Sequence, residues 1–254
     1  MAGGGPLGHA DRMRVIGIDA CRAGWAAVLV DDGEVAGVLA AAALAPVLAA
    51  WPGAAAIGID MPLGLVRRGW RDADRLAAAR LGRHRSRVFA VPPAPVWDEP
   101  GHAAAVRRCR ELTDPPAGFS RQAWNLKDKI REANELDSGG AAALHEVHPE
   151  LAFAALGDGL PVAAGKKTWN GQMTRRRLLD QAGLRLPDDL AGAQARVAPG
   201  AAGQVIPAGL VPPDDILDAA AAAWSAGRIA RGEAVSLPDP PGRDQAGRPL
   251  AIWF

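Results

Sequence analysis

Two segments of the chain share a pattern in which apolar residues lead directly into an aspartate. They are Val15–Asp19, which reads Val-Ile-Gly-Ile-Asp, and Ile57–Asp60, which reads Ile-Gly-Ile-Asp. Short apolar runs of this kind are typical of buried strands. We therefore expect both aspartates at the points where central strands leave the core, the position at which metal-dependent phosphoryl-transfer folds carry their first metal ligand.

Two further acids are candidates for the same site. Glu146 lies between Leu144 and Val147, which suits the edge of a strand. Asp218 belongs to an expected helix, and Asp215, three residues before it, shares its face. Asp214 is four residues before Asp218, so spacing alone does not choose between these two neighbours.

Carboxylates that converge from different elements are what divalent-metal phosphodiester chemistry requires, with two ions about 3.5–4 Å apart. Oxygen ligands favour Mg²⁺ or Mn²⁺ over Zn²⁺. Asp19 and Asp60 could also be turn-forming residues, and Asp214 and Asp215 could simply cap a helix, so the combination of acids carries the prediction. The predicted catalytic acids are Asp19, Asp60, Glu146 and Asp218, and the predicted metal ligands are Asp19, Asp60, Glu146, Asp215 and Asp218.

Other chemistries lack their motifs. The chain contains no G-x-S-x-G, P-loop or G-x-G-x-x-G sequence, and its histidines lack the close spacing of a zinc site. His148, two residues after Glu146, is the one histidine that we place near the substrate. The two cysteines, Cys21 and Cys109, indicate neither a metal site nor a disulfide framework.

A net charge of +1 gives no overall bias toward nucleic acid. Nucleic acid could then be bound only by local basic segments. Two such segments are present, an arginine-rich segment at 67–87 and a basic helix after Lys166. Each is either a solvated helix face or a surface that binds phosphates. The predicted substrate-binding residues are Arg85, Arg87, His148, Lys166, Lys167 and Arg175.

The elements that must position these residues follow from the pattern. Strands at 14–20, 25–31 and 34–40 form an antiparallel meander, and a fourth strand at 55–59 delivers Asp60. We expect a flexible segment at 1–13, then one domain at 14–254 with a mostly helical insertion at about 66–140. Further elements are helices at 45–51, 72–81, 99–112, from 120 through 132, at 150–156 and from 212 onward, and a final edge strand at 249–254.

No signal peptide or membrane-spanning run is evident. We therefore expect a cytoplasmic protein with no membrane partner, and the sequence is silent on its oligomeric state.

Several segments, in order, resemble a bacterial and archaeal family of unknown function described as predicted nucleases with a ribonuclease H-like fold. These segments are Gly17–Trp25, Gly58–Gly64, Ser86–Phe89, Glu146–Phe153, Lys166–Gly171 and Asp215–Trp224. The resemblance implies an α/β fold in which helices flank a mixed five-stranded sheet of order 3-2-1-4-5. It also implies that Asp19 is the first-strand acid, that Asp60 or Glu146 is the second, and that Asp218 is the acid of the last helix.

The leading expectation is a metal-dependent nuclease with Mg²⁺ or Mn²⁺ as cofactor and DNA or RNA as partner, cleaving endo- or exonucleolytically. One alternative is a non-catalytic nucleic-acid-binding or scaffolding protein on the same fold. A second is an ATP-dependent phosphotransferase related to actin and sugar kinases, which would need glycine-rich phosphate loops. Only 139–140 and 157–159 offer weak candidates for such loops.

Overall fold

The computed structural model describes residues 12–137, 144–195, 205–245 and 247–254. The predicted flexible segment at 1–13 and the predicted end of the helical insertion at 138–140 therefore fall largely outside the described residues.

The N-terminal part of the chain forms the predicted meander. Strands β1 (Arg14–Cys21), β2 (Gly24–Asp31) and β3 (Glu34–Ala41) are antiparallel neighbours. The turn between β2 and β3 has positive φ at Asp32 and Gly33, which is the backbone of a tight type I′ hairpin and explains the choice of Asp-Gly.

Two parallel strands extend the sheet beyond β1, and a short antiparallel strand extends it beyond β3. Strand β4 (Ala56–Ile59) pairs with β1, β5 (Leu144–Glu146) pairs with β4, and β6 (Val205–Ile206) pairs with β3. The order is β5-β4-β1-β2-β3-β6. The first five strands thus have the predicted order, but the predicted count of five is wrong because β6, two residues in a segment rich in Pro, Gly and Ala, adds a sixth.

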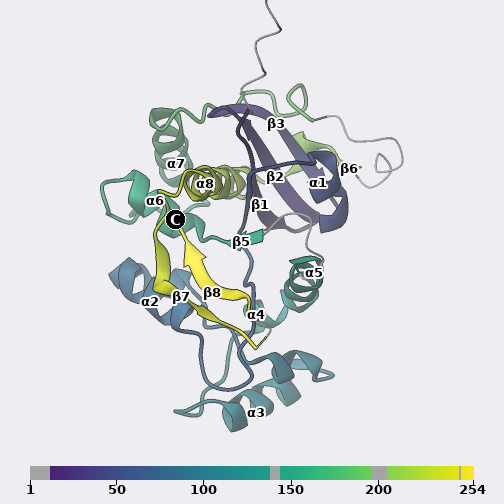
Figure 1. Cartoon of the computed structure of the whole chain (residues 1–254), viewed down its shortest axis with the longest axis vertical. Coiled ribbons are helices and arrows are strands. Elements are labelled where there is room, and N and C mark those ends of the chain that lie inside the picture. The colour runs from purple at the N-terminus through teal and green to yellow at the C-terminus, as the bar shows by residue number, and fades with distance from the viewer. Residues whose placement is uncertain (1–11, 138–143, 196–204, 246) are drawn as a thin grey trace, which may run out of the picture.

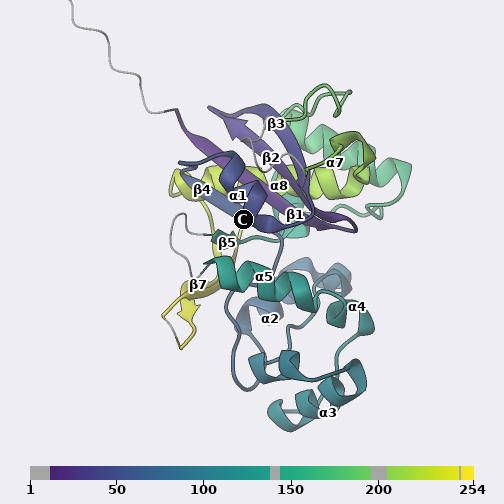
Figure 2. The same cartoon turned by 90° about the vertical axis from the view of Figure 1, so that its right-hand side faces the viewer.

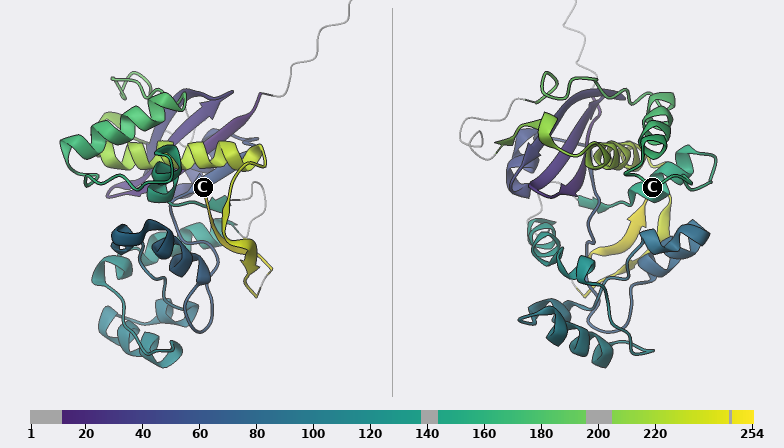
Figure 3. Two further views of the ribbon diagram at one scale, coloured as in Figure 1. Left: turned by 90° about the vertical axis from the view of Figure 1, so that its left-hand side faces the viewer. Right: turned by 180° about the vertical axis from the view of Figure 1, so that it is seen from behind.

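Alternation along the strands divides the core into two layers. Val15 and Val28 belong to the layer beneath α8, whereas Ile16 and Ile18 belong to the opposite layer. The first layer is covered by helices α6 (Pro149–Leu156), α7 (Trp169–Gln181) and α8 (Pro213–Ala230). The second is covered by α1 (Leu44–Ala50) and α5 (Lys127–Asp137). Figures 1 and 3 show α8 and α1 on opposite faces of the sheet.

The described part of the segment between β4 and β5 contains helices and no strand, with irregular stretches at 60–71, 88–93 and 113–120, and Figure 2 shows its helices gathered below the sheet. The helix expected from Ser120 divides at Asn125 and Leu126. Trp25 on β2 donates a 2.9 Å hydrogen bond to Glu132, which ties α5 to the meander. The remaining elements of this segment are α2 (Asp72–Leu81), η1 (Gly82–Arg87), η2 (Ala94–Asp98), α3 (His102–Leu112) and α4 (Arg121–Trp124).

The C-terminal segment forms a separate two-stranded sheet from β7 (Ser236–Arg243) and β8 (Pro249–Trp253). The predicted last strand is therefore present, but its partner is β7. The three prolines of β7 argue against a strand, which is why the pattern did not reveal it. An isolated bridge between Val147 and Trp253 joins the hairpin to the end of β5. No described helix has the length and apolar character needed to cross a membrane.

Candidate functional site

Asp19 and Asp60 lie at the same edge of the sheet because their strands are parallel neighbours. The register pairs Gly17 with Gly58 and Ile18 with Ile59. The backbone N–H of Asp60 donates a 2.8 Å bond to the carbonyl of Ile18, which continues the ladder past β4. The two carboxyl groups therefore stand side by side, each two residues beyond a paired glycine.

Helix α8 can approach these strands closely because both glycines lack a side chain. A Cβ atom on Gly17 would lie 2.0 Å from the backbone nitrogen of Ala223, and one on Gly58 would lie 2.6 Å from the carbonyl oxygen of Ala222. Side chains two residues apart on a strand share a face. Asp19 and Asp60 consequently face the layer that contains α8. Asp218 lies in the first two turns of that helix.

The carboxyl groups of Asp19, Asp60 and Asp218 are close enough to influence one another's protonation. Burial raises the pKa of Asp19 well above its ordinary value, and the charges of Asp60 and Asp218 raise it further. Burial also raises the pKa of Asp60 to about 6, although the charge of Lys166 and, to a lesser extent, a hydrogen bond with the Asp19 carboxyl oppose the rise. The pKa of Asp218 is about 6, again chiefly because of burial. Bringing these groups together therefore costs free energy when all three are ionised.

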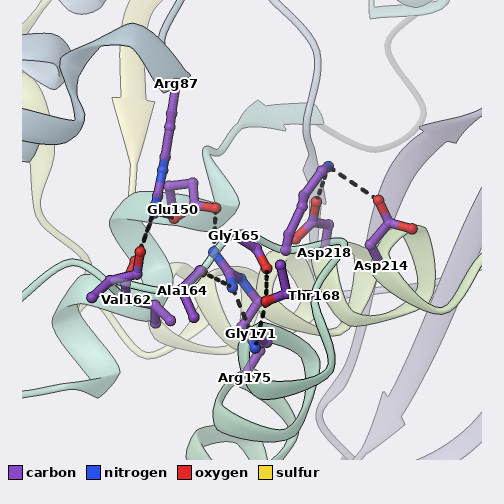
Figure 4. A network of polar contacts seen from close by, with 12 residues as sticks. Arg87, Glu150, Val162, Ala164, Gly165, Thr168, Gly171, Arg175, Asp214 and Asp218 are labelled. Carbon is purple, nitrogen blue, oxygen red and sulfur yellow. Dashed lines mark hydrogen bonds and ion pairs between the residues drawn. The ribbon is translucent and has the colours of Figure 1, made fainter.

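Lys166 supplies the nearest positive charge. Its Nζ donates a 2.6 Å bond to Oδ2 of Asp218 and lies 4.0 Å from Oδ2 of Asp214. Figure 4 shows Asp214 and Asp218 next to each other on α8, with dashed lines marking both ion pairs. Burial would lower the pKa of Lys166, but the charges of Asp218, Asp19 and Asp60 outweigh it and raise that pKa, so the ammonium remains charged. Asp215, partly buried beside them, has its pKa raised to about 6 by burial and by the charge of Asp214.

Glu146 is held differently, by a buried arginine. Nη2 of Arg71 lies 2.6 Å from both carboxylate oxygens of Glu146, and the backbone N–H of Leu63 donates a further bond of 2.8 Å. Arg71 also lies 3.5 Å from Asp74. Burial raises the pKa of Glu146, and the Arg71 ion pair opposes that rise. The negative charge of Glu146 is thus already balanced, unlike those of Asp19 and Asp60.

Glu150 forms a second buried ion-pair network. It accepts a 2.7 Å bond from Arg87 and a 2.5 Å bond from Arg175, which is completely buried. Arg87 also donates to the carbonyl of Val162 at 2.8 Å. Figure 4 shows Glu150 between the two arginines. Both arginines were expected to bind substrate, but here their guanidinium groups join η1, α6 and α7. The sequence places Arg71 only within the arginine-rich segment, as part of a solvated or phosphate-binding surface, and assigns no role to Glu150, since burial of single charged residues leaves no mark in the pattern.

These groups line one pocket of about 420 Å³ between the sheet and the helical segment. Phe89 and Gln122 line it from the helical side. His148 also lines it; burial lowers the pKa of this imidazole, and its Nδ1 is buried without a hydrogen-bond partner among the described residues. The charged groups at the pocket are Asp19, Asp60, Asp74, Arg87, Glu146, Glu150, Lys166 and Asp218.

The other predicted phosphate-binding residues lie at the surface. Arg85 is exposed on η1, and Lys167 is exposed just before α7. In the arginine-rich segment, Arg75 pairs with Asp72 at the surface and Arg80 lies 5.6 Å from the ring centre of Phe254. This segment therefore mixes structural ion pairs with free surface charge.

The site brings together oxygen donors that suit a hard cation, and one of them lacks a partner. Oδ1 of Asp218 is buried and accepts no hydrogen bond from the part of the chain that the structure describes. In the present side-chain arrangement, no three His, Cys, Asp or Glu residues among those described stand close enough together to hold a metal ion. Lys166 occupies the other oxygen of Asp218 in this arrangement.

No curated protein and no solved structure matches the chain. A match to a family does exist, and it includes all of the acids, the lysine and the buried ion pairs of the site. It agrees with the expected membership of a family whose function is unknown. The chain belongs to the family described as "Protein of unknown function (DUF429)", which matches residues 17–243.

Proposed function

We propose that the protein is a metal-dependent nuclease that hydrolyses phosphodiester bonds in DNA or RNA. The proposal rests on one observation: the carboxyl groups of three acids lie together, with the ammonium of Lys166 beside them. The acids are Asp19 on β1, Asp60 just after β4 and Asp218 on α8. Buried acids that raise one another's pKa are costly to the fold. Such an arrangement is typical of functional sites rather than of structural ion pairs.

The donor set fits Mg²⁺ or Mn²⁺. Carboxylate oxygens are hard ligands, and the unpartnered Oδ1 of Asp218 is a buried acceptor that a cation would satisfy. Asp19, Asp60 and Asp218 would hold the metal, with Asp215 at the rim. Glu146 remains outside this set in our proposal because Arg71 already balances its charge. When bound, divalent metal supplies the Lewis acidity that activates water and stabilises the leaving oxygen of a phosphodiester.

The topology supports a ribonuclease H-like assignment. Five strands have the order β5-β4-β1-β2-β3, with an antiparallel meander followed by two parallel strands. The acids stand at the end of the first strand, just after the fourth and on the last helix. This is the arrangement that the family resemblance implies, and it favours phosphodiester chemistry over the phosphotransferase alternative.

The remaining groups of the pocket would orient the substrate. The Lys166 side chain is 39% exposed, so its ammonium can contact a phosphate once it leaves Asp218. His148 lines the same pocket, and its buried Nδ1 has no hydrogen-bond partner among the described residues. We propose that Arg87 and Arg175 act indirectly, because their bonds to Glu150 fix the segment from Val162 to Lys166 beside the acids.

Isothermal titration of Mn²⁺ tests the metal site directly. Wild type is expected to bind Mn²⁺, and the double variant Asp19→Asn/Asp218→Asn is expected to lose that binding. The matched control is Asp98→Asn/Asp188→Asn, which removes two carboxylates that are 78% and 96% exposed. Equal binding by wild type and the Asp19/Asp218 variant would overturn the proposed metal site.

Activity requires a second measurement. Wild type with Mn²⁺ or Mg²⁺ is incubated with labelled single-stranded and duplex DNA and RNA, and Asp19→Asn serves as the inactive variant. Cleavage that Asp19→Asn abolishes supports the proposal. Metal-independent binding of these probes without cleavage would instead support a non-catalytic nucleic-acid-binding protein.

A further inference from the structure

One surface beside the acidic pocket combines an exposed aromatic ring with unpaired positive charge. We call it the α7 track, and it consists of Lys167, Trp169, Met173, Arg177 and Arg185. Trp169, Met173 and Arg177 are spaced by four residues, so they lie along one face of α7. All of the track residues are exposed. With thirteen residues, α7 gives the track a length of about 20 Å.

Trp169 is the distinctive member of this surface. All eight tryptophans lie among the described residues, and seven of them are buried or half-buried. Trp169 is 73% exposed, and Met173 one turn later is 38% exposed. An indole that contacts so little of its own protein presents a flat π face to solvent.

The charge around this ring is strongly positive. Between Leu160 and Arg185 the only acid is Asp180, against six Lys and Arg residues. Lys166, Arg175 and Arg176 form ion pairs with Asp218, Glu150 and Asp188. The other three, Lys167, Arg177 and Arg185, form no ion pair with any described residue. Arg176, Arg177 and Arg185 also line one open hollow of about 630 Å³ at the end of α7, with Asp180 as the acid among its lining residues.

The track begins at the proposed active site. Trp169 is three residues from Lys166, so their Cα atoms are at most about 11 Å apart. Lys166 itself contacts Asp218 in the pocket. Helix α7 packs beside α8, as Figures 1 and 3 show, so the track leads away from the acids along a rigid element.

We infer that the α7 track binds a single-stranded polynucleotide and guides it to the acidic pocket. This inference rests on the proposed function for the choice of a polyanion, and it adds the class of substrate. A base stacks on the indole of Trp169, which requires an unpaired base because a duplex hides its base faces. Lys167, Arg177 and Arg185 contact the backbone phosphates on either side.

The positive charge of the α7 track favours a single-stranded polynucleotide over a protein as its partner. Only two residues of the track, Trp169 and Met173, are apolar. Its other three residues, Lys167, Arg177 and Arg185, are cations without an ion pair among the described residues, and they lie before, on and after α7. An anionic strand that carries both phosphates and π faces matches both features. A second copy of this chain would place the same cations opposite one another.

The test measures binding without cleavage. Fluorescence anisotropy follows a short labelled single strand of mixed sequence, as DNA and as RNA, and the corresponding DNA duplex, all in EDTA. Wild type is expected to prefer a single strand. Trp169→Ala weakens that binding about tenfold, Trp169→Phe restores most of it, and duplex binding is unchanged. Arg177→Gln lowers the slope of log affinity against log salt by about 0.7.

Matched controls remove exposed groups outside the track. Leu210→Ala deletes an apolar side chain that is 77% exposed, and Arg107→Gln deletes an exposed charge on α3. Both are expected to leave affinity unchanged. Unchanged single-strand affinity in Trp169→Ala, equal losses for both strand types, or self-association of wild type that Trp169→Ala abolishes would overturn the inference.

The outcomes for the track and for catalysis are separate. Single-strand binding that depends on Trp169, together with no cleavage in Mn²⁺, upholds the track and removes the proposed nuclease activity. Cleavage that Asp19→Asn abolishes, together with a single-strand affinity that Trp169→Ala leaves unchanged, upholds the nuclease and removes the track.

Discussion

Gly17 and Gly58 are paired neighbours on β1 and β4, and both lie against the backbone of α8. Each glycine stands two residues before an aspartate of the site. The close approach that these glycines permit brings α8, and with it Asp218, to the strand ends. The same Gly-Ile-Asp sequence therefore sets both the packing and the position of the carboxylates.

Gly17→Ala is expected to destabilise the protein strongly. The new methyl group would lie 2.0 Å from the nitrogen of Ala223 and 2.1 Å from the carbonyl oxygen of Ala219, so backbone must move. Overpacking of a well-packed core costs about 1–3 kcal/mol, and we expect the upper end of this range in urea unfolding.

Gly242→Ala is the matched control, because its methyl group would meet its nearest neighbour, the oxygen of Leu250, at an ordinary 3.5 Å. Equal stability of the two variants would contradict the close packing of α8 on β1.

The acids of the site predict an unusual dependence of metal-free stability on pH. An aspartate titrates near pH 3.9 in an unfolded chain, but Asp60 and Asp218 titrate near pH 6 in the folded protein. The folded state therefore binds more protons between these values, so the contribution of these groups to stability falls as the pH rises from about 4 to 6 and levels off once the pH exceeds the folded pKa.

Urea unfolding in EDTA at a series of pH values checks this dependence. Asp60→Asn/Asp218→Asn removes the titrating groups, so its stability relative to wild type should increase between pH 4 and 7. Asp98→Asn/Asp188→Asn should show no such trend. A constant difference between wild type and the Asp60/Asp218 variant would contradict the raised pKa values.

Much of the sheet is predictable because local patterns determine it. The alternation and turn residues of the meander, the apolar run before Asp60 and the proline-led start of α8 agree with the strands and helices observed. Strand β6 and the proline-containing β7 were missed, since tertiary pairing and not residue preference makes them strands.

The site was predictable in part. Glu146 is the last residue of β5 and Asp60 lies just past β4, as the patterns predict, whereas β1 continues two residues beyond Asp19 to Cys21. The ion pairs of the site could not be predicted, because they join residues far apart in the chain. Arg71 pairs with Glu146, and Arg87 and Arg175 both pair with Glu150. The sequence alone does not show whether the side chain of a basic residue faces solvent or pairs with a buried carboxylate.

Lys166→Met is expected to strengthen Mn²⁺ binding while it weakens the metal-free fold. The lysine ammonium neutralises Asp218 at 2.6 Å, so it competes with a cation for the same carboxylate. Removing it should raise Mn²⁺ affinity about tenfold by isothermal titration, a gain of about 1.4 kcal/mol. Arg107→Gln, the loss of an exposed charge elsewhere, should leave the affinity unchanged. Weaker binding by Lys166→Met would mean that the lysine orients the acids for the metal.

Glu150→Gln tests whether the buried ion pairs of Arg87 and Arg175 hold the site together. Arg175 is completely buried, so neutralising its partner leaves an uncompensated charge in the core. Breaking a buried pair in this way costs about 3–5 kcal/mol, and urea unfolding should show a loss near the lower bound because glutamine still accepts hydrogen bonds.

Asp188→Asn is the control, since it breaks an ion pair of α7 whose carboxylate is 96% exposed and should cost about 0–1 kcal/mol. If Glu150→Gln were as stable as Asp188→Asn, the arginines would be free to leave Glu150, and direct contact between Arg87 and a substrate phosphate would become the better explanation for its position at the pocket.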